Sequence, residues 1–259
     1  MSSHPGEDVM ETRPCYLYGV MGDGGPGDFT AHGLRDQPVE IVRYEDLAAL
    51  VSLAPAEGCP VTRPNVVAHQ LVLDAAMRNG AVLPMRFGVV APDARTVRDQ
   101  FLRAQAARLR DLLALVAGKV ELVVKASWAE QSVFQEIVAA NPEIRALRDA
   151  IVGRPEPDTR ATRIALGQMV EADLRVRRDQ DSRRILDVLA PLAHDVKNGK
   201  NETEMMVLNA AFLVGTRRQD AFDTAVDALR EAFGQRLAFR SLGPLPPYSF
   251  VSMTLEVDR

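Results

Sequence analysis

Short apolar stretches set off by glycine and proline dominate the start of the chain. Cys15–Met21 is apolar, is bounded by proline and glycine, and predicts a strand. A glycine-rich loop, Gly22–Gly27, follows it. Two further short strands are predicted at Val39–Ile41 and Leu50–Leu53, on either side of a polar turn.

A helix and another strand come next. Thr62 and Pro64 mark a helix start, because proline is tolerated in the first turn, where its missing N–H is not needed. Asn79-Gly80 marks the end of that helix. Ala81–Val90 predicts a strand, and Pro84 within it indicates an edge or bulged strand.

From Asp93 the apolar period becomes helical and continues to Gly118. The positions that share one helical face are Val97, Phe101, Leu102, Leu109, Leu112, Leu113 and Val116. One amphipathic helix is therefore expected here.

The second half of the chain begins with a clear alternation. Lys119–Trp128 predicts a strand, and Val133–Val152 and Thr159–Ala190 predict helices separated by a proline-containing break. Asn198-Gly199 is a pair typical of hairpin turns. The remaining elements are a strand at Glu204–Val214, a helix at Gln219–Phe233, and extended segments at Leu237–Leu242 and Phe250–Val257.

This order of elements predicts an α+β protein of two domains that meet near Gly118. Residues 1–14 are polar and predict a disordered tail, and 15–118 predicts an N-terminal α+β domain, a loose sandwich. Residues 119–259 follow the order strand, helical hairpin, strand, strand, helix, strand. That is the ferredoxin-like plan with an enlarged helical crossover.

The amino-acid composition argues against several classes of function. Hydrophobic residues make up 47% and charged residues 25% of the 259 positions, which is typical of a soluble globular protein. A formal net charge of −4 gives no electrostatic reason to expect a nucleic-acid or anionic-membrane partner. The two cysteines, Cys15 and Cys59, lack metal-type spacing, and we see neither a signal peptide nor a transmembrane segment. A cytoplasmic protein is expected.

The strongest hint of enzymatic chemistry is Gly22–Gly27, which matches the G-x-G-x-x-G pattern after a strand. A dinucleotide site also needs a crossover helix directly behind the loop. Pro38 and another predicted strand follow too soon for one. A plain glycine loop is therefore favoured, and a nucleotide-binding enzyme remains the alternative hypothesis.

No other pattern indicates catalysis, a cofactor or a metal. The four histidines, His4, His32, His69 and His194, show no metal-ligand spacing with Cys, Asp or Glu. His69 lies among apolar helix positions and is interpreted as a packed or capping residue. Arginines over Arg175–Arg184 alternate with acidic residues, so a solvated helix face with salt bridges is favoured over a nucleic-acid site.

A proline-rich segment near the C-terminus, Gly243–Val251, is the candidate binding surface. Prolines fix the backbone in an extended form, and tyrosine adds apolar area with a polar tip. The predicted partner-binding residues are Pro244, Leu245, Pro246, Pro247 and Tyr248. In the competing interpretation, the prolines turn the chain and Tyr248 packs in the core.

Several motifs, taken in order, resemble one known family. They are Tyr16-Leu17-Tyr18-Gly19-Val20, His69, Val82-Leu83-Pro84-Met85-Arg86-Phe87-Gly88, Val120-Glu121-Leu122-Val123-Val124-Lys125, Trp128, Ala211-Phe212-Leu213-Val214 and Gly243-Pro244-Leu245-Pro246-Pro247-Tyr248-Ser249-Phe250-Val251. Together they are similar to the GvpL/GvpF family of gas vesicle proteins, over about Tyr16 to Val251. Leu245 departs from the larger aromatic residue often found there in the family.

The resemblance implies two α+β domains, no enzymatic activity, and association with the small hydrophobic shell subunit and other accessory proteins of the gas vesicle. It therefore implies an accessory protein of gas vesicle assembly that binds proteins, with no small-molecule substrate, nucleic acid or membrane partner. Whether the chain is of the F or the L type stays open.

Overall fold

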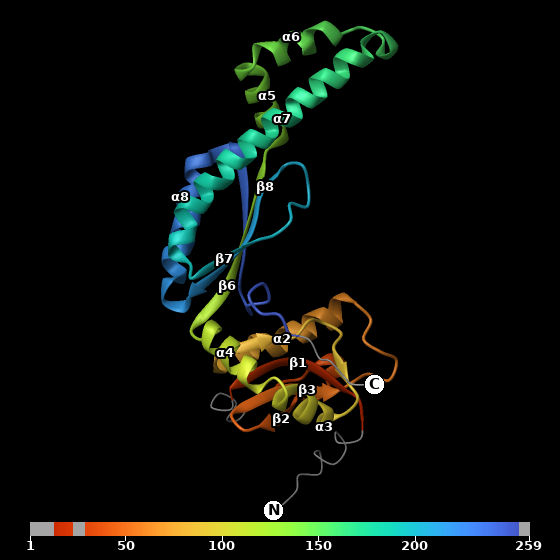
Figure 1. Ribbon diagram of the computed structural model, residues 1–259, viewed down its shortest axis with the longest axis vertical. Coiled ribbons are helices and arrows are strands. Elements are labelled where there is room, and N and C mark those ends of the chain that lie inside the picture. Colours follow the sequence, from red (N-terminus) through yellow and green to blue (C-terminus); the bar gives the residue numbers. More distant parts are fainter. Residues whose placement is uncertain (1–12, 23–28, 254–259) are drawn as a thin grey trace, which may run out of the picture. The chain divides into compact units, whose positions relative to one another are not determined.

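The computed structural model describes residues 13–22 and 29–253. These residues form two compact units (Figure 1): one holds the chain up to Glu121 together with the residues from Gly243 on, and the other is Leu122–Leu242. The point at which the chain passes from the first unit to the second, after Glu121, lies close to the predicted boundary at Gly118. The predicted second domain, 119–259, differs from this division at its end, because Tyr248, Val251 and Met253 pack against the core of the first unit. Residues 1–12 of the predicted tail lie outside the described residues.

The first unit is built on one sheet. Its strands are β1 (Cys15–Gly22), β2 (Glu40–Tyr44), β3 (Leu47–Leu53), β4 (Val82–Pro84) and β5 (Val90–Ala91). The sheet order is β2-β3-β1-β4, β5 also pairs with β1, and each of these pairs is antiparallel. The predicted strand Ala81–Val90 is thus two short strands. The first, which contains Pro84, lies at the sheet edge, as its proline predicts.

Both faces of this sheet are buried, which explains why β1 is apolar throughout. Alternate residues of a strand point to opposite faces. Cys15 and Leu17 belong to one core cluster, and Tyr16 and Tyr18 belong to the other. The partners on the first face include Val97, Phe101, Leu102, Leu109 and Val116, and those on the second include Val72, Leu73 and Ala76.

Two helical regions supply those partners. α2 (Arg63–Asn79) has Thr62 as its N-cap and ends at Gly80, both as predicted. The helix predicted from Asp93 to Gly118 consists instead of three pieces. They are α3 (Ala94–Thr96), the π-helical segment η2 (Val97–Arg103) and α4 (Ala106–Val116). The wider π-helical turn keeps its apolar positions buried while the chain changes its helical phase.

A second sheet, with strand order β7-β8-β6-β9, organises the other unit. The elements of this unit are β6 (Lys119–Trp128), α5 (Glu130–Ala140), α6 (Pro142–Ile151), α7 (Glu156–Leu189), η3 (Ala190–Leu192), β7 (Asp195–Asn198), β8 (Met206–Gly215), η4 (Thr216–Arg218), α8 (Gln219–Phe233), η5 (Gly234–Arg236) and β9 (Leu237–Leu245). The first unit has one further short helical turn, η1 (Leu34–Asp36). Helices α7 and α8 contact each other and β8 (Figure 1). The aromatic rings of Phe212 and Phe222 meet with centroids 5.1 Å apart, joining β8 to α8.

The helix predicted at Val133–Val152 is two helices, because a cap interrupts it. The side chain of Asn141 accepts hydrogen bonds from the backbone N–H groups of Glu143 and Ile144 at 3.0 and 3.2 Å. Pro142 occupies the first helical position behind this cap. Asn141 therefore ends α5 and starts α6.

Candidate functional site

The segment Gly243–Val251 leaves the end of β9 and closes into a turn. The peptide bond between Gly243 and Pro244 is cis. Backbone N–H groups of Phe250 and Val251 both donate to the carbonyl oxygen of Pro247, at 3.1 and 3.2 Å. Phe250 therefore lies in a turn, although it was predicted to begin an extended segment. Residues 254–257 of that prediction lie outside the described residues.

Tyr248 anchors this turn to the first unit. Its side chain packs against the core cluster that contains Tyr16 and Tyr18. Its hydroxyl group lies 3.2 Å from Nε2 of His69, a residue of α2 that is 179 positions away in the sequence. The prediction that His69 is a packed histidine is confirmed, since only 3% of its surface is exposed.

The hydrogen bonds around His69 have a defined direction. The Tyr16 hydroxyl accepts from the backbone N–H of Gly88 at 3.0 Å, and its own hydrogen then donates to Nδ1 of His69 at 2.9 Å. Nδ1 is then the acceptor and the proton of the neutral imidazole is on Nε2, because the carbonyl oxygen of Met85 beside Nε2 can only accept a hydrogen bond. From there it faces the carbonyl oxygen of Met85 and the Tyr248 hydroxyl, each at 3.2 Å.

This environment favours neutral His69. Burial lowers the pKa of His69 from 6.5 to about 4, because desolvation disfavours the imidazolium. Protonation of Nδ1 would also remove the acceptor that the Tyr16 hydroxyl uses. The imidazole thus serves as a fixed hydrogen-bonding bridge between β1, the loop after β4 and the Gly243–Val251 segment.

We expect stability to depend on pH through this histidine. Because the pKa of His69 is lower in the folded than in the unfolded state, the unfolded chain binds more protons as the pH falls from 6.5 towards 4. The free energy of unfolding should therefore drop by at most about 3 kcal/mol over that range. Urea unfolding at a series of pH values measures this slope. His69→Gln should reduce the dependence of the free energy of unfolding on pH. An unchanged dependence would contradict its assignment to His69.

A second anchor lies one residue further along. Both the backbone N–H and the hydroxyl of Ser249 donate to the carboxylate of Glu121, each at 2.7 Å. Glu121 is 3% exposed, and burial raises its pKa, although the two bonds from Ser249 oppose that shift. Tyr248 and Ser249 together fix the turn at two points. Neither His69 nor Glu121 could be predicted as a partner of this turn from local patterns, since both lie more than a hundred positions away.

The predicted binding residues divide into exposed and covered ones. Pro244 is exposed and Leu245 is half-buried, whereas Pro246 and Pro247 are buried and Tyr248 is half-buried. A pocket of about 360 Å³ lies beside Pro244 and is otherwise lined by Asp74, Met77 and Arg78 of α2. The accessible surface of the predicted binding residues therefore centres on Pro244 and Leu245, while Tyr248 holds the segment in place.

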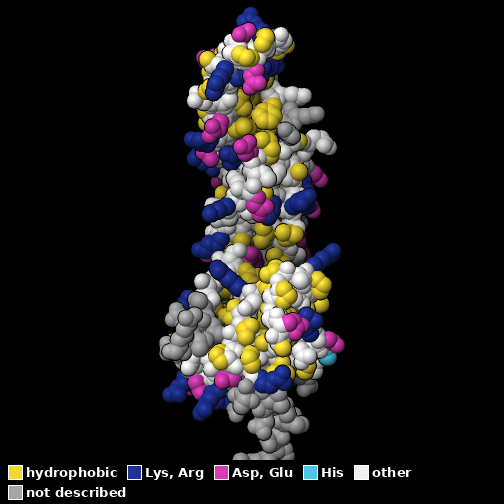
Figure 2. Space-filling view, turned by 90° about the vertical axis from the view of Figure 1, so that its right-hand side faces the viewer, with side chains coloured by type: hydrophobic (Ala, Val, Ile, Leu, Met, Phe, Trp, Pro, Cys, Tyr) yellow, Lys and Arg dark blue, Asp and Glu magenta, His cyan; other side chains and the backbone are white. Residues whose placement is uncertain are grey.

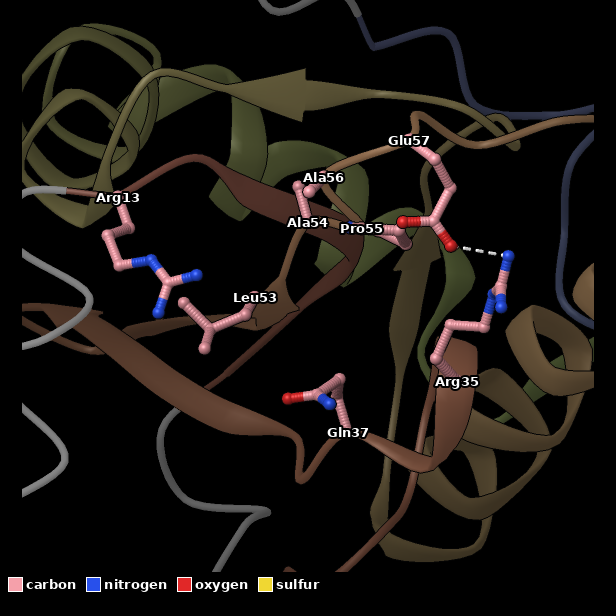
Figure 3. Close-up of a pocket in the computed structure, with 8 residues that line it drawn as sticks. All are labelled: Arg13, Arg35, Gln37, Leu53, Ala54, Pro55, Ala56 and Glu57. Atoms are coloured by element: carbon pink, nitrogen blue, oxygen red, sulfur yellow. Dashed lines mark ion pairs between the residues drawn. The ribbon is translucent and has the colours of Figure 1, made fainter.

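Another hollow, of about 300 Å³, lies at the opposite end of β3 from the turn that joins it to β2 (Figure 3). Arg35 and Glu57 form an ion pair of 2.5 Å at one side of it. The other lining residues are Arg13, Gln37, Leu53, Ala54, Pro55 and Ala56. The described lining residues include no nucleophile and no pair of groups placed for proton transfer. This hollow therefore lacks the groups that a catalytic centre requires.

The glycine loop behind the nucleotide-binding hypothesis is mostly outside the described residues, which include only Gly22 of Gly22–Gly27. Between Phe29 and Val39, the described chain contains just the three-residue turn η1 as helical structure. A dinucleotide fold requires a long helix at this point. The part of the chain that can be described therefore gives that hypothesis no support.

The described residues contain neither a cluster of metal ligands nor a membrane-spanning helix. Within residues 13–22 and 29–253, no group of three or more His, Cys, Asp or Glu side chains is arranged to hold a metal ion. Neither Cys15 nor Cys59 takes part in a disulfide. Burial raises the pKa of Cys15 to about 11, which keeps it protonated and unreactive at neutral pH. Among the described helices, none has the length and apolar character needed to cross a bilayer.

The arginine-rich part of α7 forms the predicted salt bridges. Arg175 pairs with Glu171 at 3.1 Å, and Arg177 pairs with Asp173 at 2.6 Å, each one helical turn away. Arg178 lies over the ring of Trp128 and donates to backbone carbonyl groups. These arginines therefore serve the protein itself, which agrees with the prediction of a salt-bridged helix face.

One acidic residue of this helix has a role that the sequence did not reveal. Asp181 is 3% exposed and accepts hydrogen bonds from the Trp128 indole at 2.9 Å and from Arg236 at 2.8 Å. Arg236 also pairs with Glu136 of α5 at 2.7 Å. This network joins α5, α7 and η5 to the end of β6.

Comparisons with known proteins agree on one family. A family model described as gas vesicle synthesis protein GvpL/GvpF matches residues 14–252. A gas vesicle protein F of a Streptomyces species is 39% identical over 91% of this chain and 98% of its own length. A gas vesicle protein F of a Nostoc species is 32% identical over 92% of this chain and 98% of its own.

Similarity to solved structures indicates the same family. The crystal structure of the gas vesicle protein GvpF from an Anabaena species superposes with a TM-score of 0.83 at 31% identity, and the match covers 93% of this chain and 99% of that one. The mixed α+β fold is therefore shared with a solved structure. These matches give no support to a nucleotide-binding enzyme.

Proposed function

This chain belongs to the GvpL/GvpF family of gas vesicle synthesis proteins and so has an accessory role in gas vesicles, and from that we propose that it binds the small hydrophobic shell subunit and other gas vesicle accessory proteins. The proposal rests on physical need. A shell that keeps liquid water from its interior requires subunits with a strongly apolar face. Before assembly, such a face is prone to aggregate unless a partner covers it.

The observation that best supports a binding role is the anchored Gly243–Val251 segment. The bonds from Tyr248 to His69 and from Ser249 to Glu121 hold it, so Pro244 and Leu245 are presented on a backbone that is already ordered. A partner would lose little conformational entropy in docking on it. We assign partner binding to Pro244, Leu245, Pro246, Pro247 and Tyr248 as one unit, with the contact made mainly by the first two.

We further infer that the protein acts without catalysis, cofactor or small-molecule substrate, in the cytoplasm and on the gas vesicle. Support comes from relatives that carry the names of gas vesicle proteins rather than of enzymes. The hydrogen-bonded residues around His69 all have structural partners, which leaves no free acid–base pair there.

We also infer a ferredoxin-like plan for the unit Leu122–Leu242 together with the flanking parts of β6 and β9. The elements follow the order strand, helices, strand, strand, helix, strand. In the sheet, the first of these strands lies between the third and the fourth, and the second lies at the edge beside the third. This order of strands in the sheet supports the inference.

A pull-down tests the binding proposal. The full chain carrying an affinity tag should retain co-expressed shell subunit, and Leu245→Glu should weaken the interaction about tenfold, because it places a charge on an apolar contact. Failure of the wild-type chain to retain the subunit, together with normal vesicles in a deletion strain, would refute the proposal. Equal retention by wild type and Leu245→Glu would refute only the assignment of the segment.

A further inference from the structure

The outer face of α2 carries apolar side chains where a surface helix ordinarily has polar ones. Val67 and Leu71, one helical turn apart, are 47% and 58% exposed. Val66 is 41% exposed, and Val61, just before the helix, is 82% exposed. In Figure 2, apolar side chains are grouped on the face of the unit that contains α2, with charged side chains dispersed among and around them. Apolar patches of this kind mark interaction surfaces.

Basic residues lie at the two ends of this apolar stripe. Arg63 and Arg78 are exposed, and neither has an ion-pair partner among the described residues. They are separated by about 22 Å along the helix axis, at 1.5 Å per residue. Between them, Asp74 already accepts a hydrogen bond from Gln70 at 2.8 Å. A bond from a neutral amide leaves the carboxylate its negative charge, so the face has a positive charge at each end, one negative charge near Arg78, and a net positive charge.

The same face continues into the segment to which binding was assigned above. Arg78, Met77 and Asp74 of α2 line the pocket of about 360 Å³ together with Pro244. A bound chain could thus contact Leu71, fill this pocket and reach Pro244 without leaving the first unit. An exposed apolar stripe that is continuous with a pocket is a surface on which an apolar segment of a partner can pack.

We propose that the outer face of α2, from Arg63 to Arg78 and with the pocket beside Pro244, binds an amphipathic helix of the partner protein. The partner helix has an apolar centre that packs on Val67 and Leu71 and acidic residues at both ends that pair with the two arginines. It spans about 15 residues, because that length covers 22 Å. The inference rests on the proposed function, since the partner in question is the shell subunit.

The test compares variants in the same pull-down, followed by titration of the purified pair. Leu71→Glu should weaken retention of the shell subunit at least about tenfold, as loss of a central apolar contact does. Ile164→Glu on α7 is the matched control, since Ile164 is 54% exposed and should bind normally when replaced. The double variant Arg63→Glu with Arg78→Glu should bind more weakly at low salt, and the difference should shrink at high salt.

Each outcome decides between alternatives. If wild type and Leu71→Glu retain the subunit equally well, the assignment of binding to the outer face of α2 is wrong, while the proposed function stands. If wild type retains none, the proposed function fails first. A change in the oligomeric state of Leu71→Glu by size-exclusion chromatography would assign the face to a second copy of this chain and overturn the inference. Stronger binding by the arginine double variant would contradict the inference that the partner helix has acidic residues at both ends.

Discussion

Gly33→Ala should lower the free energy of unfolding by about 3–5 kcal/mol, although it adds only one methyl group. A Cβ atom at Gly33 would lie 1.8 Å from the hydroxyl oxygen of Tyr18. Tyr18 is fully buried, and its hydroxyl group accepts from the backbone N–H of Leu34 at 2.8 Å and bonds to the Ser52 hydroxyl at 2.9 Å. The ring can move only by breaking these bonds and disturbing the packed core.

Gly22→Ala provides the control for this prediction. The nearest atom to a Cβ at Gly22 is the carbonyl oxygen of Asp46 at 3.9 Å, an ordinary van der Waals distance. Its effect should stay within about 1 kcal/mol. Urea unfolding followed by circular dichroism measures both variants. Equal stability of Gly33→Ala and wild type would show that Tyr18 does not occupy the position described.

Asp181→Ala should destabilise the second unit by about 3–5 kcal/mol, the usual cost of removing one partner from a buried ion pair. The change leaves the Trp128 indole N–H without its acceptor and leaves Arg236 paired with Glu136 alone. Trp128 is the only tryptophan of the chain, so its fluorescence reports directly on this unit.

The same helix supplies the control for this second variant. Asp179 is exposed, and Asp179→Ala should change the stability by less than about 0.5 kcal/mol. If both variants unfold at the same denaturant concentration, then Asp181 contributes no more than a surface carboxylate. A large effect of Asp181→Ala alone would confirm that the network holds the helices to the sheet.

Elements whose signals are local were predictable from the sequence. The apolar run Cys15–Met21, the cap at Thr62 and the amphipathic period of Gln219–Phe233 each produced the element expected from them. One local signal was missed: Asn141-Pro142 is a helix start, because asparagine caps and proline suits the first turn. The apolar pattern continues on both sides of Asn141-Pro142, so the pattern alone predicted one helix instead of two.

The candidate site was harder to predict because its contacts are distant in sequence. Proline and tyrosine composition pointed to Gly243–Val251, but nothing in the sequence placed Tyr248 beside His69 or Ser249 beside Glu121. The competing interpretation of Tyr248 as a packed residue fits its position against the core cluster. The exposed stripe on α2 was missed as well, since valine and leucine on a helix are ordinarily taken as core.

The return of the chain to the first unit at Gly243 has a consequence for folding during synthesis. Ribosomes release the chain from its N-terminus, so β1, α2 and α4 emerge long before Tyr248, Val251 and Met253. Until those residues arrive, His69 lacks one hydrogen-bonding partner and the two core clusters lack part of their cover. The intervening unit, Leu122–Leu242, is complete first. The later-made residues thus close the earlier-made unit, and the nascent chain leaves apolar surface of that unit uncovered until Tyr248, Val251 and Met253 have been made.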